Sequence, residues 1–260
     1  MRVQIVWLLL LCVTCCHAKT VDYNLHYPFH YKTQTFTQTL TLKPNYQEHA
    51  NQQHFYTTKI HYPLLNSSNK ALTKNFNNQI KQRLDKVIKH FIKSLPKPSS
   101  LLKLKKSMKR PLTSGSNTLY VHYDAFYTDR FHVISVRFLV SYYHYGMAHP
   151  NSYFVTFNYD IRKQRTLRLN ELFQSPDYLT TLQTITRDKL RRKIVANSGR
   201  QLDHFAKKIL AEGTEAKIEN YQDWNLTPHG LLLNFSPYQV APYAVGPITI
   251  LIPYTKLAVN

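Results

Sequence analysis

The most regular hydrophobic pattern in the chain is a stripe at helical spacing in its first half. Between Ala71 and Ser94 apolar side chains recur every three or four residues, which places them on one face of a helix. The stripe consists of Leu72, Phe76, Ile80, Leu84, Val87, Ile88, Phe91, Ile92 and Leu95. A helix with one apolar face needs a partner surface, so we expect it to cover a sheet.

Alternation of apolar and polar residues predicts the strands of that sheet. The alternating or β-branched runs cover residues 34–42, 54–62, 119–127, 131–145, 152–161, 230–235 and 248–254. Pro63 is expected to end the second strand. Thr128-Asp129-Arg130 separates the third and fourth strands by so little that an antiparallel hairpin is predicted.

Two further helices are predicted in the second half of the chain. Ser175-Pro176 opens a pattern that runs to about Asn197, and Gly199 stands where a helix stop belongs. A shorter amphipathic helix spans residues 202–210. Helices and strands are segregated, which predicts an α+β fold of antiparallel sheets with helices packed on one face, in two small linked subdomains.

The first 18 residues have the pattern of a secretory leader. Arg2 is followed by an apolar run from Val3 to Val13, too short to span a bilayer, and by small or polar residues up to Ala18. We expect a signal peptide over residues 1–18, cleavage after Ala18, a secreted or periplasmic protein, and a tail over residues 19–33. A second interpretation is a lipoprotein acylated at Cys16, although the preceding residues depart from the small-residue pattern of such sites.

The leader also changes what chemistry the mature chain can use. All three cysteines, Cys12, Cys15 and Cys16, lie within it. The mature chain would then have no disulfide, no thiol nucleophile and no cysteine-based zinc site. No other apolar run is long enough to cross a bilayer, so we expect no transmembrane span in the mature chain.

Positive charge dominates the composition and is partly clustered. The chain has 34 Lys+Arg against 14 Asp+Glu, a formal charge of +20, which attracts polyanions. Residues 70–110 hold 13 basic residues and one acid, Asp85. We interpret PKPSSLLKLKKSMKRPLTSGS, from residue 96, as a basic loop without periodicity; its candidate binding residues are Lys103, Lys105, Lys106, Lys109 and Arg110. The alternative is an ordinary solvated helix face followed by a basic loop.

A tyrosine- and proline-rich segment and a turn supply the other candidates. In FSPYQVAPYAVGPITILIPY, from Phe235, the prolines stiffen the backbone. Tyr238 and Tyr243 either pack over the core or face a partner. In the turn GMAHPN, from Gly146, His149 and Asn151 either bind a partner beside these tyrosines or satisfy nearby backbone.

Motifs for catalysis are absent from the sequence. There is no HExxH or histidine–carboxylate cluster, no GxSxG elbow and no phosphate-cradling glycine loop. We therefore predict no catalytic residue, no metal and no cofactor. Asp124 lies in an alternating strand and is expected to face water or a cleft.

Two long motifs resemble the RsiV-like family, also called domain of unknown function 3298. They are YYHYGMAHPNSYFVTFNYDIRKQRTLRLNELF, from Tyr142 to Phe173, and DWNLTPHGLLLNFSPYQVAPYAVGPITILIPYTKL, from Asp223 to Leu257. Upstream, KIHYP and the long helix resemble the domain that precedes the catalytic domain of PdaC-type peptidoglycan deacetylases. The resemblance implies a PdaC/RsiV-type N-terminal α+β domain over residues 34–145 and an RsiV-like C-terminal α+β domain over residues 146–258.

The resemblance implies binding rather than catalysis. In RsiV-type anti-sigma factors the exported region binds lysozyme and signals through a transmembrane helix to a cytoplasmic segment, neither of which this sequence shows. We predict an exported non-enzymatic protein that recognises an anionic cell-envelope polymer or lipid head groups, and export disfavours nucleic acid. One alternative is a soluble lysozyme-binding or lysozyme-inhibiting protein, although two basic surfaces lack complementary potentials. Another is a peptidoglycan-associated hydrolase that uses Asp124 or His149.

Overall fold

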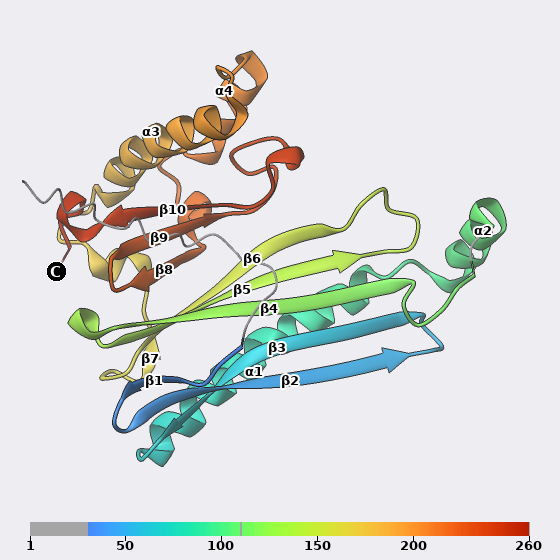
Figure 1. Cartoon of the computed structure of the whole chain (residues 1–260), viewed down its shortest axis with the longest axis horizontal. Coiled ribbons are helices and arrows are strands. Elements are labelled where there is room, and N and C mark those ends of the chain that lie inside the picture. The colour runs from blue at the N-terminus through green and yellow to red at the C-terminus, as the bar shows by residue number, and fades with distance from the viewer. Residues whose placement is uncertain (1–30, 110, 260) are drawn as a thin grey trace, which may run out of the picture.

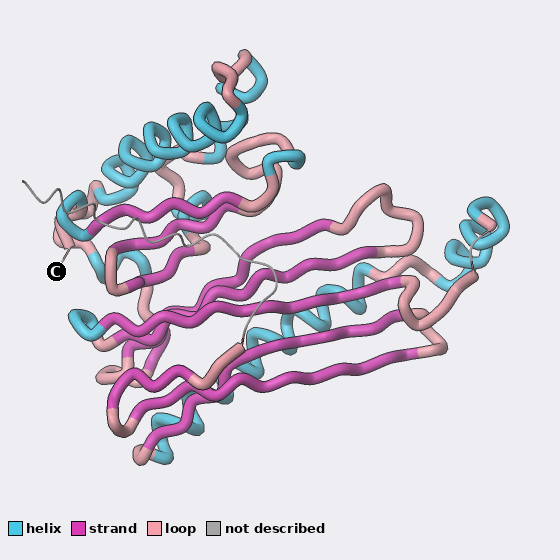
Figure 2. The backbone as a smooth tube through the Cα atoms, viewed as in Figure 1, coloured by secondary structure: helices cyan, strands magenta, loops and turns pink. Residues whose placement is uncertain are grey.

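The chain folds into four stacked layers (Figures 1 and 2). The computed structural model describes residues 31–109 and 111–259. Across them the layers are helix α1 (Lys70–Ser94), a seven-stranded sheet, a three-stranded sheet and helix α3 (Tyr178–Ser198). The predicted leader with its cleavage site after Ala18 and its acylation site at Cys16 lies outside the described residues, as does the tail up to residue 30.

The large sheet is built from consecutive strands in the order β1-β2-β3-β4-β5-β6-β7. These are β1 (Gln34–Thr37), β2 (Leu40–Asn51), β3 (Tyr56–Ser67), β4 (Asn117–Thr128), β5 (Val133–Tyr143), β6 (Asn151–Asp160) and β7 (Arg165–Thr166). All neighbours are antiparallel except β3 and β4, which run parallel. Parallel neighbours need a long crossover, and α1 with α2 (Pro98–Met108) forms it.

Two details of the predicted strands are wrong. The single strand expected over residues 34–42 is a hairpin, because the chain turns after Thr37, whose Oγ1 accepts a hydrogen bond from Thr39 N at 3.4 Å. Pro63 does not end β3, which continues to Ser67. The parallel ladder to β4 stops at Ile60, so the N–H that proline lacks is not needed on that side.

Helix α1 covers one face of the large sheet, as its apolar stripe predicts. Its buried residues are Leu72, Phe76, Ile80, Leu84, Val87 and Phe91, and they share a hydrophobic core with the sheet. Asn69 caps its N-terminus, where the side-chain oxygen accepts a hydrogen bond from Leu72 N at 3.0 Å. Ile92, which we assigned to the stripe, is instead 42% exposed.

The second sheet lies between the large sheet and α3. Its strands β8 (Trp224–Thr227), β9 (Gly230–Phe235) and β10 (Ile248–Pro253) are antiparallel in the order β10-β9-β8, so β10 is an edge. Helix α3 ends at Gly199 in the left-handed conformation, as expected. Helix α4 (His204–Gly213) follows, two residues later than predicted. Strand β8 was not predicted, since four residues carry little periodicity.

The α+β class predicted from the sequence is confirmed. The large sheet continues past the boundary predicted between residues 145 and 146, because β5 and β6 pair from Val133↔Asp160 to Tyr142↔Asn151. The two hydrophobic cores do not follow this boundary. One lies between α1 and the large sheet, and the other surrounds the small sheet and α3 on the opposite side of the large sheet. The division into two domains therefore stays a prediction.

Candidate functional site

Lysines cover the solvent side of α1. Those that are exposed are Lys70, Lys74, Lys81, Lys86, Lys89 and Lys93, and they project opposite the buried stripe. The helix has 25 residues, so the row extends over about 37 Å. Among the described residues, no carboxylate lies within ion-pair distance of these lysines.

Arg83 does not contribute to this row, although it belongs to the predicted basic stretch. Its guanidinium lies 4.1 Å from the centre of the Phe157 ring and donates to Thr166 Oγ1 at 3.1 Å. Burial lowers the pKa of Arg83. This side chain therefore fastens α1 to the sheet rather than serving a ligand.

The segment that we interpreted as a basic loop is largely the helix α2. Pro98 starts it, which suits the fixed φ of proline, and Lys109 ends it with a φ of +53°. Lys103, Lys105, Lys106 and Lys109 are exposed, and within the part of the chain that the structure describes none forms an ion pair. Arg110, the fifth predicted residue, lies outside the described residues. We call these four lysines and the α1 row together the basic face.

Helix α2 is held against the turn that leads to His149. Leu101 is buried, and Leu104 Cδ1 lies so near Gly146 that a Cβ built on this glycine would be 3.3 Å away. Gly146 has a φ of +96°, a conformation that glycine adopts without strain. Helix α2 therefore adjoins the loop between β5 and β6, at the same end of the large sheet (Figure 1).

That loop meets the loop between β9 and β10 in an exposed group of rings. His149 stacks on Tyr243 with ring centres 3.9 Å apart, and Tyr238 lies 5.3 Å from Tyr243. The Tyr243 hydroxyl donates to Pro150 O at 2.5 Å, which ties the two loops together. We call His149, Tyr238 and Tyr243 the aromatic cluster; sequence reasoning named its members, and the fold brings them together.

Tyr238 is the most unusual member of the cluster. Its side chain is 59% exposed and its φ is +70°, a conformation that costs a non-glycine residue about 1 kcal/mol or more. Backbone strain of this kind at an exposed aromatic residue marks a position worth testing for partner contact. Asn151 is different, because its Nδ2 donates to Tyr142 Oη at 3.1 Å and its Oδ1 accepts from Ser152 N. It therefore builds the start of β6.

Asp124 faces water only in part, because its side chain is 33% exposed and its carboxylate is bound by an arginine. Its Oδ2 accepts from Arg137 Nη2 at 2.6 Å and from Nε at 3.2 Å. Arg137 is 2% exposed and also donates to Asn234 Oδ1 at 3.1 Å. The network joins the large sheet to the small one, and a carboxylate held in this way is engaged in structure.

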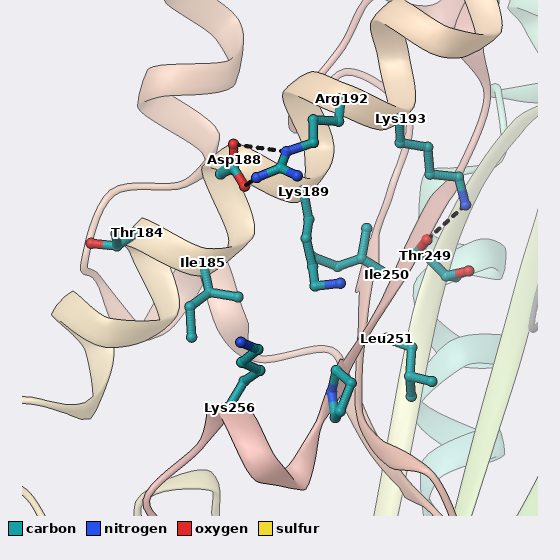
Figure 3. A pocket seen from close by; sticks show the side chains of 11 residues that line it. Thr184, Ile185, Asp188, Lys189, Arg192, Lys193, Thr249, Ile250, Leu251 and Lys256 are labelled. Carbon is teal, nitrogen blue, oxygen red and sulfur yellow. Dashed lines mark hydrogen bonds and ion pairs between the residues drawn. The ribbon is translucent and has the colours of Figure 1, made fainter. Parts of the chain in front are cut away.

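A groove that the sequence did not reveal lies between α3 and the edge strand β10 (Figure 3). Its volume is about 810 Å³, within the range of small-molecule pockets. Basic side chains from α3 and from the turn after β10 line it together with apolar ones. The basic run of α3 was visible in the sequence, but only folding brings Lys256 to it.

Metal and membrane features are limited in the described part of the chain. Over residues 31–109 and 111–259, no group of three or more His, Cys, Asp or Glu side chains could hold a metal ion. None of the helices described is long and apolar enough to cross a bilayer. The functional groups exposed on the basic face and in the aromatic cluster are ammonium groups and aromatic rings. Such groups suit binding to anions and to partner surfaces.

The layers and surfaces define an α+β protein with a basic face, an aromatic cluster and a groove. Residues 170–255 match the family described as "Protein of unknown function (DUF3298)". Residues 170–255 therefore resemble a DUF3298 domain, as the closing motif predicted. The matched residues include Tyr238, Tyr243 and most of the groove, whereas the basic face lies outside them.

Two solved structures described as DUF3298 proteins share the fold of this chain. A DUF3298 family member from Bacteroides fragilis superposes with a TM-score of 0.56 at 17% identity, over 84% of this chain and 94% of the other. A DUF3298 family protein from Pseudomonas aeruginosa gives a TM-score of 0.52 at 14% identity, again over 84% and 94%. At these identities the likeness concerns the fold alone.

A curated relative comes from Bacillus subtilis (strain 168). The chain is 33% identical over 104 residues to the peptidoglycan-N-acetylmuramic acid deacetylase PdaC. The match covers 39% of this chain and 20% of PdaC. The chain thus spans about a fifth of that protein's length.

Proposed function

We propose that the protein is exported and acts as a non-enzymatic binding protein that holds an anionic cell-envelope polymer on its basic face. The supporting observation is the arrangement of the lysines of α1 and α2, which are exposed and have no carboxylate partner among the described residues. The similarity to a peptidoglycan deacetylase is in keeping with a cell-envelope ligand.

The shape of the basic face favours a polymer over lipid head groups. The lysines are spread along α1, which is about 37 Å long, and this length suits an extended chain that carries a charge at each repeat. Release of its counterions would make binding strongly salt-dependent. A flat bilayer would instead engage only the compact lysines of α2 and the neighbouring Leu102, which is 54% exposed. Vesicles of anionic lipid therefore serve as the comparison.

Co-sedimentation with purified cell walls tests this function. The variant replaces Lys103, Lys105, Lys106 and Lys109 with Gln, and the control replaces Lys32, Lys43, Arg200 and Lys207, four exposed cations elsewhere on the surface. At about 1 kcal/mol per lysine near an anionic surface, the four lysines contribute about 4 kcal/mol, so we expect binding to weaken about a thousandfold for the variant alone. Binding should also vanish between about 0.05 M and 0.5 M salt.

Three results would contradict the proposal. An equal loss of binding in the variant and in the control would show that binding depends on the net charge of the protein and not on the basic face. Retention on the walls at high salt would show that charge is not the attraction. Stronger binding to vesicles of anionic lipid than to cell walls would show that the ligand of the basic face is lipid.

The aromatic cluster favours a second candidate function, binding of a protein such as lysozyme. Exposed tyrosines on a rigid support are typical of the residues that dominate protein interfaces. The nearby lysines of α2 would repel a basic lysozyme, so this complex should strengthen as salt rises. Titration of lysozymes against the protein and its Tyr238→Gly variant tests the idea, and the opposite salt dependence separates it from polymer binding.

A further inference from the structure

The groove between α3 and β10 presents two ammonium groups to one space. Lys189 reaches into it from α3, and Lys256 reaches into it from the short 3-10 helix η5 (Tyr254–Lys256) that follows β10 (Figure 3). Across the described residues, neither lysine has a carboxylate within ion-pair distance. Two such cations close together repel each other unless an anion lies between them.

The carboxylate at the rim of the groove is already neutralised. Asp188 accepts hydrogen bonds from Arg192, whose Nε lies 3.1 Å from Oδ1, and from Arg191 Nη2 at 3.3 Å. These arginines, Arg192 first, hold the pKa of Asp188 below its usual range. The charge left over in the groove is therefore positive, which suits an anionic ligand.

The walls below these cations are apolar. Ile185 comes from α3, and Ile250, Leu251 and Pro253 come from β10. Inorganic anions gain nothing from such walls, whereas an alkyl chain gains about 0.8 kcal/mol for each methylene that it buries. The combination of a cationic rim and an apolar wall fits a ligand with a charged head and a hydrocarbon chain.

The groove follows a sheet edge, so an added peptide strand is the alternative occupant. Lys193 Nζ donates to Thr249 O at 2.9 Å, and this contact separates the groove from a smaller hollow of about 320 Å³ farther along β10. Pro253 offers no N–H to a neighbouring strand. Lysine and proline are the residues that block strand addition at an edge, so a compact ligand fits better than a peptide.

We propose that this groove binds a single-chain anionic amphiphile, a fatty acid or an alkyl phosphate, with its head between Lys189 and Lys256. The hydrocarbon chain lies along Ile185 and the side chains of β10. The ligand and the residues differ from those of the basic face, so this site is independent of the proposed polymer binding. It also lies almost wholly within the matched DUF3298 residues 170–255.

Calorimetric titration with defined probes tests the site. The probes are dodecanoate, decanoate, dodecyl phosphate, dodecanol and inorganic phosphate, each below the concentration at which it aggregates. We expect affinity to rise about fourfold for each added methylene, with inorganic phosphate and dodecanol much weaker. The comparison of carboxylate with phosphate heads identifies which anion the two lysines prefer.

Variants locate the binding and separate it from the proposed function. Replacing both Lys189 and Lys256 with Gln should weaken amphiphile binding on the order of a hundredfold, since each charged hydrogen bond contributes about tenfold. Replacing Lys86 and Lys89 on α1 removes the same charge and should leave amphiphile binding unchanged. Ile185→Ser should flatten the chain-length dependence, with thermal unfolding as the check that it folds.

Three outcomes would overturn this inference. One is an affinity for dodecyl phosphate no higher than for inorganic phosphate. Another is an equal loss in the α1 control, which would reduce the interaction to net charge. The third is binding of an extended acidic peptide that depends on Lys189 and Lys256 while the amphiphiles fail to bind, which would make the groove a strand-addition site.

Discussion

Asp223 is a half-buried acid whose charge should cost the folded protein stability. It precedes β8, and Thr156 on β6 acts on its carboxyl to lower the pKa. Desolvation outweighs this effect and raises the pKa of Asp223 from 3.8 to about 7. Asn at this position keeps the shape and the acceptor oxygen but removes the charge, so we predict that Asp223→Asn stabilises the protein at neutral and higher pH.

The size and the pH window of this gain follow from the two pKa values. A group whose pKa is raised on folding favours the folded state at low pH, and that advantage is lost as pH rises from about 4 to 7. About three pKa units at 1.36 kcal/mol each correspond to about 4 kcal/mol. The residue is half-buried, so we expect about 2 to 4 kcal/mol above pH 7 and almost none below pH 4.

Urea unfolding of both proteins between about pH 4 and pH 8 measures this difference. His122 also affects acid stability, because burial and then the neighbouring His61 lower its pKa to about 4. That contribution is present in both proteins and cancels in their difference. A difference that does not change with pH, or a variant that is less stable at pH 8, would show that the Asp223 carboxyl is solvated or needed as a charge.

Three further substitutions test the packing around the proposed sites. Arg137→Met leaves Asp124 without its partner between the sheets and should cost about 3 kcal/mol by urea unfolding; a cost under about 1 kcal/mol would contradict the role of the network. Gly213→Ala places a Cβ 1.8 Å from Gln239 O, so we expect a loss of about 1–3 kcal/mol in thermal unfolding, and an unchanged transition would contradict this close approach. Tyr238→Gly relieves a φ of +70°, so the fold should keep or gain about 1 kcal/mol; a destabilised variant would show that the ring is needed for packing rather than for a partner.

Long periodic segments of this fold could be predicted because one neighbouring surface decides them. The stripe of α1 and the alternation of β4 each reflect burial on one side, whereas the first eight residues of β5 are buried on both faces. Helix α2 has no such periodic pattern, because only Leu101 of its residues is buried. The prediction that Pro63 ends β3 failed because it depended on where β4 stops pairing, which is a property of another strand.

The candidate sites show the same limit more strongly. His149, Tyr238 and Tyr243 were identifiable because they stand in two loops of unusual composition, but their stacking required β6 and β9 to lie in adjacent layers. The groove depends on Lys189 and Lys256, which are distant in sequence and meet only through α3 and η5. The periodicity of a sequence predicts which side chains are buried. Which cations come together in space depends on the topology of the folded chain.

The position of α2 links the basic face to the aromatic cluster in a way that constrains both proposals. Leu104 packs against Gly146, three residues before His149, so the lysines of α2 act on any partner that reaches the rings. A long anionic polymer could contact both surfaces at once, and removing either would then weaken it. A basic protein would meet attraction at the rings and repulsion beside them, so the lysine-to-glutamine variant of α2 should weaken polymer binding and strengthen lysozyme binding. Because the variant is expected to change the two affinities in opposite directions, measuring both shows whether the surface binds a polymer or a basic protein.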